Sequence, residues 1–388
     1  MKNKKLFLFT TDYPPSQGGG IGIHAEFISK TLKSKGFQIV VLSEYYINSS
    51  AEAIANYKKK NDIEILKMPA APTMFKLLQK IILSLKMGFS KRPDIIIGTG
   101  KHSVWFASLL SFFLRIPLIT IGHGSEFTET TSKYDKILNR LAFGGSDLLI
   151  SVSHFTKNII FKENIKPKKI VVIHNPVDSK KVFKLKDNSY LDFIEKNDLK
   201  EKKILLTVGA MSKRKGQHQV IEALKNVTKN ISNIVYVIIG LPNDIERLKE
   251  LAKKNNVSKN VVFKGVVSTK ELNLWYNSCH VFCMTSTNNK GDFEGFGIAV
   301  KEAALCKKPS IVSDSSGLEE AVINNLTGLV FQQNNIKELE HCITDLITND
   351  KKRNKFGLSA FENAVNNNSE NIIGEKYYSQ IKNVLKKK

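Results

Sequence analysis

The chain has 388 residues, of which 42% are hydrophobic, and this length is sufficient to bury the cores of two α/β domains. No stretch approaches the roughly 18–20 consecutive apolar residues that span a bilayer, and the apolar run after the N-terminal lysines is too short for a signal peptide. The four cysteines show neither zinc-ligand spacing nor an extracellular disulfide framework, so we expect reduced thiols in a cytoplasmic protein.

The net charge of +23 is concentrated in the first half of the chain, because residues 1–187 include 29 basic and 14 acidic side chains. Such an excess suits nucleic acid, anionic lipid or phosphorylated substrates. No zinc finger, RNP sequence or arginine-rich arm accompanies the charge, so we expect no nucleic-acid partner. A lysine-rich genomic bias would give the same excess as an anionic membrane partner, and the charge alone does not choose between them.

Short β-branched runs alternate with helical segments along the whole chain, which is the pattern of parallel sheets covered by crossover helices. The predicted strands of the first half are Leu6–Thr10, Gln38–Leu42, Ile63–Lys67, Asp94–Ile97, Leu118–Ile121, Asp147–Ser151 and Ile170–Ile173. Those of the second half are Ile204–Val208, Ile234–Ile239, Val261–Phe263, Val281–Met284, Ser310–Val312 and Gly328–Phe331. The polar stretch 176–203 predicts a connection, so we place two domains at 1–180 and 181–369 and a C-terminal helix at 370–388.

A glycine-rich loop follows the first predicted strand and opens a helix that reaches about Lys35. Glycine lets backbone amides approach a ligand closely, so Gly19 and Gly20 are candidates for anion binding. The loop does not match the G-x-G-x-x-G dinucleotide fingerprint, because Ile23 stands in place of the third glycine. His24, on the first helical turn, could act in the site or simply pack.

Residues 75–92 predict a basic and highly apolar helix. One apolar stripe contains Phe75, Leu78, Ile82, Leu85 and Phe89, and it is widened by Leu77 and Ile81. This pattern suits a crossover helix buried against the first sheet or an amphipathic helix in an anionic membrane interface. With the charge of the first half, it leads us to predict a cytoplasmic protein held peripherally on the inner face of the cell membrane.

The segment Ile121-Gly122-His123-Gly124-Ser125-Glu126 follows an apolar strand, which places His123 at the carboxyl end of that strand. Ligands of open α/β sheets bind in the crevice beyond these ends. A lone histidine is more often a satisfied structural group, so position alone does not establish a role for His123.

The segment Thr207–Gly216 ends the first strand of the second domain and contains Gly209, Arg214 and Lys215. We expect Lys215 to begin the next helix, where its ammonium group could neutralise a diphosphate. Most lysine-rich loops are solvated surfaces, so this prediction depends on the motifs that accompany the segment.

Two carboxylates, Glu294 and Glu302, flank a Gly-Phe-Gly turn that leads into a predicted helix over Ile298–Cys306. The first backbone N–H groups of a helix have no intrahelical partner, and the helix dipole adds about half a positive charge there. Such a turn can bind a phosphate or diphosphate. Glu294 would lie on the loop beside whatever the phosphates carry, and Glu302 would lie within reach of a hydroxylated group such as a ribose.

These motifs resemble, in order, those of the retaining glycosyltransferases of family 4, which have the GT-B fold. That fold is an α/β architecture of two facing Rossmann-like domains with parallel sheets and a cleft between them. Glu294 and Glu302 match the E-x7-E signature, residues 19–24 match G-G-x-x-x-H, and residues 123–126 match H-G-x-D/E. Residues 209–216 match G-R-x-x-x-x-K-G except that Ala210 replaces the arginine. One cation on the diphosphate is therefore missing, unless Arg214 or Lys213 replaces it.

The resemblance implies that Glu294 and His123 hold the transferred sugar and that Lys215 stabilises the leaving diphosphate, so these three would be catalytic. Val267, in the loop after Val261–Phe263, would meet the nucleotide base, and Glu302 would bind the ribose. The implied donor-binding set is Gly19, Gly20, Gly209, Arg214, Lys215, Val267, Glu294, Phe296, Gly297, Ile298 and Glu302.

The implied activity transfers a hexosyl or N-acetylhexosaminyl group, with retention, from a UDP- or GDP-sugar. The acceptor would be a cell-surface glycan or a lipid-linked molecule, as in polysaccharide or lipopolysaccharide biosynthesis. The chain contains no D-x-D motif, so we expect no metal and no other cofactor. Two alternatives stay open: a GT-B sugar-nucleotide epimerase, which would need acid/base carboxylates in the first domain, and a non-catalytic nucleotide- or lipid-binding scaffold, which Ala210 would favour.

Overall fold

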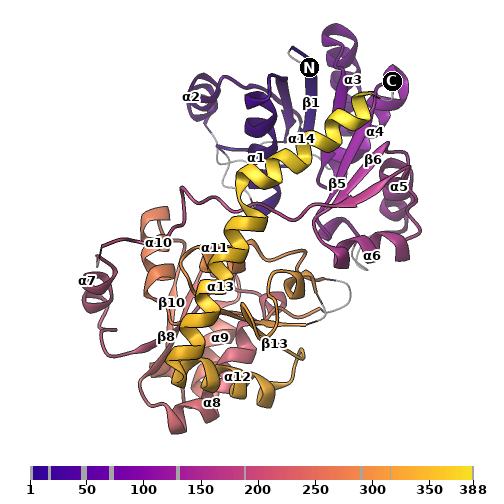
Figure 1. The fold of residues 1–388 in the computed structure, drawn as a ribbon. Helices are drawn as coiled ribbons and strands as arrows, with labels where there is room; N and C mark the ends of the chain where they lie inside the picture. The colour runs from indigo at the N-terminus through magenta and orange to yellow at the C-terminus, as the bar shows by residue number, and fades with distance from the viewer. Residues whose placement is uncertain are drawn as a thin grey trace. The chain divides into compact units, whose positions relative to one another are not determined.

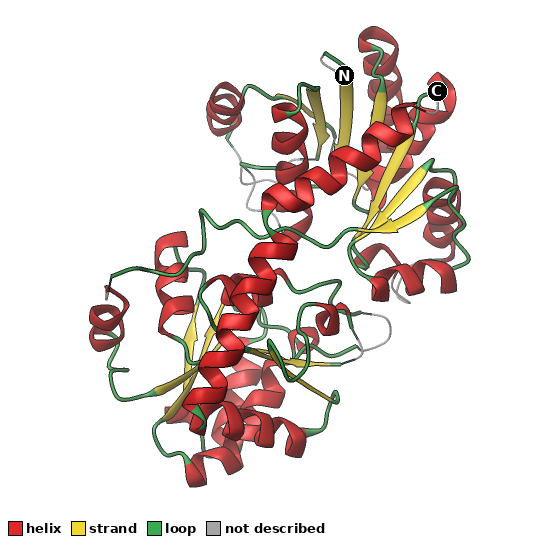
Figure 2. Ribbon diagram, viewed as in Figure 1, coloured by secondary structure: helices red, strands yellow, loops and turns green. Residues whose placement is uncertain are grey.

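The computed structural model describes residues 3–15, 19–44, 50–69, 74–127, 132–187, 189–288, 292–314 and 316–386. The chain divides into two compact units, one formed by Met1–Asn175 with Glu370–Lys388 and the other by Pro176–Ser369. Each unit is built on a parallel sheet covered by helices (Figures 1 and 2). Gly18, which belongs to the predicted glycine-rich loop, lies outside the described residues.

The first unit contains, within its described residues, a seven-stranded sheet in the order β3-β2-β1-β4-β5-β6-β7. Its strands are β1 (Lys5–Thr10), β2 (Gln38–Ser43), β3 (Glu64–Lys67), β4 (Ile95–Thr99), β5 (Leu118–Gly122), β6 (Leu148–Ser151) and β7 (Ile170–Val172). Its helices are α1 (Gly20–Ser34), α2 (Ala51–Asn61), α3 (Met74–Lys91), α4 (Lys101–Leu114), α5 (Lys133–Gly144), α6 (His154–Lys162) and α14 (Glu370–Lys386), with a 3-10 turn η1 (Ser125–Phe127).

The second unit contains, in the part that the structure describes, a six-stranded sheet in the order β10-β9-β8-β11-β12-β13. Its strands are β8 (Lys203–Val208), β9 (Ile234–Ile239), β10 (Val261–Lys264), β11 (Val281–Met284), β12 (Ser310–Ser313) and β13 (Gly328–Phe331). Its helices are α7 (Ser189–Lys196), α8 (Gln217–Asn230), α9 (Ile245–Lys254), α10 (Thr269–Ser278), α11 (Ile298–Leu305), α12 (Ile336–Thr348) and α13 (Asp350–Asn368), with 3-10 turns η2 (Lys213–Lys215), η3 (Ser258–Asn260) and η4 (Gly317–Glu320).

The strands are apolar on both faces because helices cover both faces of each sheet. In β8, Leu205 joins the core on one face, while Ile204 and Leu206 join the core on the other, and all three are fully buried. Every strand predicted from the sequence is present, with ends that differ by at most two residues. The predicted α/β architecture of parallel sheets covered by crossover helices is therefore confirmed.

In each sheet the strand order reverses at its first strand, and this arrangement fixes where a ligand can bind. β1 lies between β2 and β4, and β8 lies between β9 and β11. The crossover helices on the two sides of such a strand lie on opposite faces, which opens a crevice beyond the carboxyl ends of the paired strands. The loops after β8 and β11, and those after β1 and β4, are therefore the positions where a site is expected.

The apolar stripe predicted for residues 75–92 is divided between two faces of helix α3, so the prediction of one stripe is wrong. Leu77, Ile81 and Leu85 pack against the core of the first sheet. The remaining stripe positions are exposed, with Phe75 at 69%, Leu78 at 55%, Ile82 at 56% and Phe89 at 58% of the maximum. The helix therefore has two apolar faces, one buried against the first sheet and one at the surface.

The buried face of α3 also contains a charge. Lys80 is 1% exposed and forms an ion pair with Glu44, whose exposure is 6%. A buried charge is tolerated only with a partner, so each side chain of this pair requires the other. Lys80 therefore cannot take part in any contact of α3 with an outside surface.

Helix α14 packs against α1 within the first unit. Ile373, Tyr377 and Ile381, one helical turn apart, are fully buried on its inner face. A Cβ at Gly374 would lie 2.8 Å from the Thr31 side chain, so the two helices approach closely there. Among the described residues, no helix is long and apolar enough to cross a membrane.

Candidate functional site

The loops after β8 and β11 meet at the switch point of the second sheet. The Thr285 hydroxyl donates to the carbonyl oxygen of Gly216 over 2.7 Å, and the Thr287 amide donates to the carbonyl oxygen of Arg214 over 2.7 Å. Gln219, on the first turn of α8, donates to the carbonyl oxygen of Thr285 over 2.6 Å. These bonds hold the two loops against each other at the edge of the sheet where α/β proteins bind ligands.

Two glycines of the β8 loop are required by its geometry. Gly216 has a φ of 69°, and a Cβ there would lie 1.7 Å from the carbonyl oxygen of Thr285. Gly209 has a φ of 155°, and the Lys215 side chain lies over it, 3.4 Å from the position a Cβ would take. Lys215 lies in η2 and α8 begins at Gln217, so the expectation that Lys215 begins the helix is wrong by two residues.

The structure brings together Arg214, Lys215 and Glu294, which the sequence assigned to one site. Lys215 Nζ lies 2.6 Å from Glu294 Oε2, and Arg214 Nη1 lies 2.5 Å from the same oxygen. Arg214 Nε also lies 3.2 Å from Asp292 Oδ1. Burial alone would raise the pKa of Glu294, but the charges of Lys215 and Arg214 outweigh it and hold the pKa below its usual range.

The acidic loop then enters α11 through a second glycine-dependent turn. Gly297 has a φ of 81°, and a Cβ there would lie 2.4 Å from the Leu318 side chain. Phe296 is 2% exposed, and the Gly317 amide donates to the carbonyl oxygen of Glu294 over 2.9 Å. Glu294 therefore lies on a rigid turn beside the amino end of α11, which begins at Ile298 and favours an anion there.

Glu302 lies one turn inside α11 and has a partner that the sequence did not reveal. The Tyr276 hydroxyl donates to Glu302 Oε2 over 2.6 Å. The pKa of Glu302 is raised above its usual value, mainly because the carboxyl group is buried. Asp178 adds to the rise, while the hydrogen bond from Tyr276 and the charge of Lys181 oppose it. Tyr276 lies on α10, and no local pattern in the sequence links it to a carboxylate 26 residues away.

The other donor-binding candidates of this unit lie in neighbouring loops. Val267 is partly buried against the core that contains β8 and β11, in the loop after β10. The Gly240 amide donates to the carbonyl oxygen of Gly265 over 3.2 Å, which ties that loop to the end of β9. The carbonyl oxygen of Ala210 accepts a bond from Gln217 over 3.1 Å. The loops after β8, β9 and β10 thus share one edge of the sheet.

In the first unit, Glu126 holds the loop that contains His123. Its carboxylate accepts bonds from the amides of His123, at 3.1 and 3.3 Å, and Gly124, at 2.8 Å. Glu126 is 1% exposed, and burial raises its pKa to about 7 although these amides oppose the rise. The glutamate of the H-G-x-E segment is therefore a support for the loop, and the structure places His123 at the carboxyl end of β5.

His123 is also held from its ring side. His123 Nε2 lies 2.8 Å from Thr99 Oγ1, and the ring packs edge-on against His24 with centroids 5.0 Å apart. His24 is 1% exposed, and its Nε2 lies 3.1 Å from the Tyr377 hydroxyl of α14. His24 therefore supports His123 and is itself supported by a tyrosine 353 residues away, a partner that sequence patterns do not indicate.

Both histidines are kept uncharged. Burial lowers the pKa of His123 to about 4. Burial, and then the neighbouring His123, lower the pKa of His24 well below its usual value. Nδ1 of His24 has no hydrogen-bond partner among the described residues, so the ring has no acceptor that would stabilise a proton there.

The glycines of the first loop are only partly explained by packing. Gly19 is the N-cap of α1, and among the described residues no atom lies within 4 Å of the position a Cβ would take there. Gly20 is exposed and begins the helix. In contrast, a Cβ on Gly22 would lie 2.9 Å from Asp12 Oδ2. Packing among the described residues therefore accounts for Gly22 but not for Gly19.

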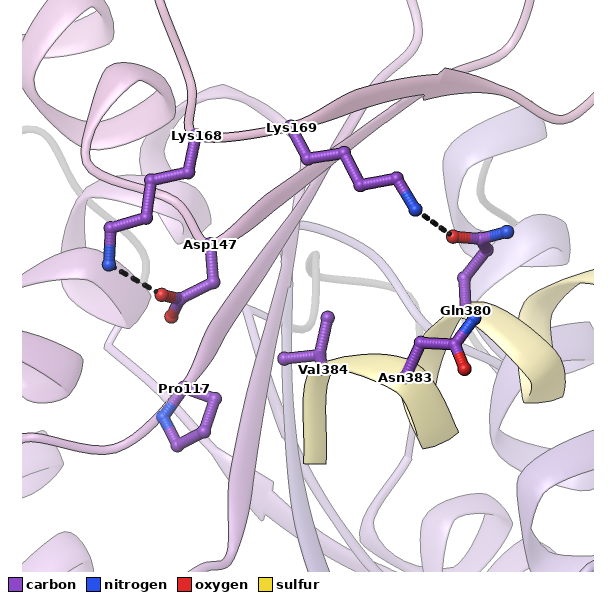
Figure 3. Close-up of a pocket in the computed structure, with 7 residues that line it drawn as sticks. All are labelled: Pro117, Asp147, Lys168, Lys169, Gln380, Asn383 and Val384. Atoms are coloured by element: carbon purple, nitrogen blue, oxygen red, sulfur yellow. Dashed lines mark hydrogen bonds and ion pairs between the residues drawn. The ribbon is translucent and has the colours of Figure 1, made fainter. Parts of the chain in front are cut away.

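A cavity of about 320 Å³ lies in the first unit, lined by Pro117, Asp147, Lys168, Lys169, Gln380, Asn383 and Val384 (Figure 3). It lies between the residues that precede β5, β6 and β7 and the last turns of α14. Lys168 pairs with Asp147 at 2.7 Å, and Lys169 donates to Gln380 over 3.0 Å. Because these lysines already have partners and the cavity lies at the amino ends of the strands, it is not the candidate site.

Two parallel-sheet Rossmann-like units in one chain are the architecture of the GT-B glycosyltransferases. The model of Glycosyltransferase Family 4 matches residues 18–181, and the model of Glycosyl transferases group 1 matches residues 191–363. The chain belongs to this family of glycosyltransferases, and the resemblance inferred from its motifs is confirmed.

Known proteins are similar to the chain over nearly their whole length. An uncharacterized glycosyltransferase of Methanocaldococcus jannaschii is 26% identical, over 100% of this chain and 99% of the relative. A GDP-mannose-dependent alpha-(1-6)-phosphatidylinositol monomannoside mannosyltransferase of Mycobacterium tuberculosis is 23% identical, over 92% of this chain and 93% of the relative. Anabaena HepE, solved in complex with UDP and glucose, is 19% identical with a TM-score of 0.82, over 98% of this chain and 100% of that chain.

The uncharged histidines predict an acid-sensitive first unit. The folded-state pKa of His123, about 4, lies below the ordinary value of 6.5, so its contribution to stability is complete above pH 6.5 and is lost as the pH falls toward 4. We expect the urea midpoint to fall over this range and the slope to be smaller in His123→Gln. The matched change at exposed His341 should leave the slope unchanged, and equal slopes in all three proteins would contradict the assignment.

Proposed function

We propose that the protein is a retaining glycosyltransferase that moves a sugar from a UDP- or GDP-sugar to a glycan or a lipid-linked acceptor without a metal ion. The convergence of Arg214 and Lys215 on Glu294, beside the amino end of α11, is the observation that carries the proposal. Two cations and a helix amino end favour a diphosphate. The carboxylate among them favours a hydroxylated group attached to that diphosphate.

The proposed mechanism begins by exchanging one anion for another. Without donor, Glu294 occupies both cations; when the donor binds, its diphosphate takes over Arg214 and Lys215 and frees the carboxylate for hydroxyls of the sugar. As the bond to the sugar breaks, Lys215 and the amides of Gly297 and Ile298 stabilise the growing charge on the leaving diphosphate. The acceptor then attacks on the face that the diphosphate leaves, and its proton passes to the departing phosphate oxygen.

We assign His123 of the first unit to the binding of the transferred sugar, as the resemblance of its H-G-x-E segment implies. Its imidazole is neutral at physiological pH, so it can hydrogen-bond a sugar hydroxyl without placing a second positive charge near an oxocarbenium-like centre. Glu302, with one oxygen bound by Tyr276, keeps a second oxygen that could accept a bond from the ribose. We assign the nucleotide to the second unit and the acceptor to the basic first unit.

The names of similar proteins support a nucleotide-sugar donor and an acceptor at the cell surface. The similar mycobacterial enzyme is named for GDP-mannose, while Anabaena HepE was solved with UDP and glucose. A relative of Staphylococcus aureus, 24% identical over 100% of this chain and 99% of its own length, is named for capsular polysaccharide biosynthesis. We therefore propose a hexosyl or N-acetylhexosaminyl donor and an acceptor of the cell surface, with the base to be decided by a thermal-shift screen of UDP- and GDP-sugars.

Substitutions at the cluster separate leaving-group stabilisation from sugar positioning. Lys215→Ala should lower turnover on the order of 10²–10³-fold, because a charge-assisted contact to the leaving group is lost. Glu294→Gln should lose transfer to a similar extent yet bind the nucleoside diphosphate at least as tightly as the wild type, because the competing carboxylate charge is gone. Donor turnover and calorimetric titration with UDP and GDP measure the two effects.

Lys225→Ala is the matched control, since Lys225 is an exposed lysine on α8 of the same unit and has no role in the proposed mechanism. It should retain both activity and nucleotide affinity. Wild-type turnover in Lys215→Ala and Glu294→Gln would remove the cluster from the mechanism. Isomerisation of the donor without transfer would identify an epimerase, and binding without any donor chemistry would identify a scaffold.

A second prediction concerns metal ions. The positive charge at the proposed diphosphate site comes from Arg214, Lys215 and the amides of α11, so EDTA should leave most of the activity intact. The assay compares dialysed enzyme with EDTA alone and with EDTA followed by excess Mg²⁺ or Mn²⁺. Complete loss in EDTA that either ion restores would place Asp292 and Glu294 in a metal site.

The first unit also has a surface suited to an anionic membrane. The exposed face of α3 is apolar, and α4, which contacts α3 and α5, exposes Phe112 at 78% and Phe113 at 55%. On α5, Tyr134 and Leu141 are exposed at 82% and 66%. Exposed apolar side chains beside basic ones are what an amphipathic surface needs to lie in a lipid interface. We propose that this surface holds the enzyme on the membrane where a lipid-linked acceptor resides.

We therefore expect the protein to sediment with anionic liposomes and to be released by high salt, since each basic residue near such a bilayer adds about 1 kcal/mol that salt screens. Lys76→Gln with Lys86→Gln, and Phe75→Ser with Phe89→Ser, should each weaken sedimentation. Lys80 is excluded from the test because it is buried in its pair with Glu44.

Lys225→Gln with Lys253→Gln removes the same charge from exposed positions of the second unit and serves as the control. It should sediment like the wild type. Equal sedimentation with neutral and anionic liposomes, or none with either, would contradict the membrane assignment and favour a soluble acceptor.

A further inference from the structure

The second unit contains a cavity of about 440 Å³ that the proposed reaction does not use. It opens at the amino ends of β8, β11 and β12, next to Lys203, His280 and Pro309. The Glu294 cluster follows the carboxyl ends of β8 and β11. β8 has six residues, so the two places are separated by about 20 Å of strand. The cavity is therefore distinct from the candidate donor site.

Cations dominate the lining of this cavity. It is lined by Lys200, Lys202, Lys203, Lys307, Lys308 and Arg353, with Glu201 as the one carboxylate among its lining residues. Two further carboxylates offset part of the charge: Asp350 lies 2.6 Å from Arg353 and 4.0 Å from Lys203, and Glu195 lies 2.9 Å from Lys200. Even with these pairs counted, the lining keeps an excess of positive charge.

The excess of positive charge affects buried groups of the lining as well as exposed ones. Arg353 is 9% exposed and donates to the carbonyl oxygens of Leu346 and Ile347, so its position is fixed. Burial, and then Arg353, Lys308 and Lys203, lower the pKa of His280 to about 3. Burial likewise lowers the pKa of Lys308, and Lys184 and Arg353 lower it further. Positively charged groups thus converge on one space with too few anions to balance them.

Another part of the cavity lining is apolar and aromatic. Helix α7 contributes Tyr190, Leu191 and Ile194, and Leu191 is 44% exposed. Lys184 Nζ lies 4.9 Å from the centroid of the Tyr190 ring, so the tyrosine lies beside the cationic region. A ligand that satisfies both parts of the lining carries a negative charge at one end and a ring or carbon skeleton at the other, and the volume is in the range of small-molecule sites.

From this geometry we infer that the cavity is a second ligand site, which binds a phosphate ester of a sugar or nucleoside with its phosphate on Lys203, Lys308 and Arg353 and its organic part against Tyr190 and Leu191. Lysine and arginine together hold phosphate through charge-assisted bonds. A bound dianion removes the mutual repulsion of the lining cations, so binding stabilises the second unit.

The test uses the full-length protein carrying Arg214→Ala and Lys215→Ala, so that the donor cluster contributes no phosphate binding. Calorimetric titrations with UMP, ribose 5-phosphate and inorganic phosphate should each show one site, with at least one organic ester binding more tightly than inorganic phosphate. Adding Lys203→Gln and Lys308→Gln should weaken binding about tenfold or more for each cation removed. Adding Tyr190→Ala should abolish the preference for the organic ester.

Adding Lys253→Gln and Lys259→Gln instead removes the same charge from exposed positions of this unit and should change nothing. A second measurement locates the ligand: the imidazole resonances of His280 should shift when UMP or ribose 5-phosphate is added. Removing the lining cations should also leave the melting temperature unchanged or higher without ligand, because like charges are separated.

Three results would overturn the inference: no binding of any of the three phosphates, binding that survives Lys203→Gln with Lys308→Gln, or inorganic phosphate equal to both esters. These outcomes are independent of the proposed transfer reaction, since the donor cluster is absent from the tested protein. Binding in the parent that also survives the Arg214 and Lys215 substitutions, and is lost only with the lining cations, is the result that supports the second site.

Discussion

The candidate donor site depends on how closely two backbone loops approach each other at the switch point of the second sheet. At Gly216 a Cβ would lie 1.7 Å from the carbonyl oxygen of Thr285, so no other residue allows this contact. The approach lets Thr285 and Thr287 bond the backbone of the β8 loop, which directs Arg214 and Lys215 toward the loop after β11. A side chain at position 216 would push the loops apart and break the ion pairs with them.

Glu294, at the junction of the two loops, reduces the repulsion between two neighbouring cations before any ligand binds. Arg214 and Lys215 lie side by side with most of their side chains buried, so the two cations repel each other and have lost much of their hydration. Glu294, 2.5 and 2.6 Å away, compensates both. A diphosphate that replaces the carboxylate exchanges one anion for another instead of burying a new charge. In the proposed mechanism, that exchange also turns Glu294 toward the sugar, so donor binding and sugar positioning become one event.

The first unit, by contrast, keeps its central histidine uncharged. The Glu126 carboxyl group accepts hydrogen bonds from the amides of the loop, and the ring of His123 hydrogen-bonds Thr99 and packs edge-on against His24. The Tyr377 hydroxyl of α14 then holds His24. The C-terminal helix thus does more than cover the sheet. It completes a row of polar groups that begins at the carboxyl end of β4.

Local patterns predicted the strands and the motif loops, because a strand buried on both faces is a run of apolar residues and a turn with positive φ usually contains glycine. Contacts between distant segments have no such local pattern. The contacts of Tyr276 with Glu302 and of Tyr377 with His24 were therefore found only in the structure. Helix α3 shows a third limit. The helix is apolar on two faces, so periodicity could not tell which face covers the sheet. Lys80 can be buried because it pairs with Glu44, which follows β2, and the pattern of the helix itself does not contain this partner. Where either face of a helix could pack against the sheet, contacts with residues distant in the sequence determine which face is buried.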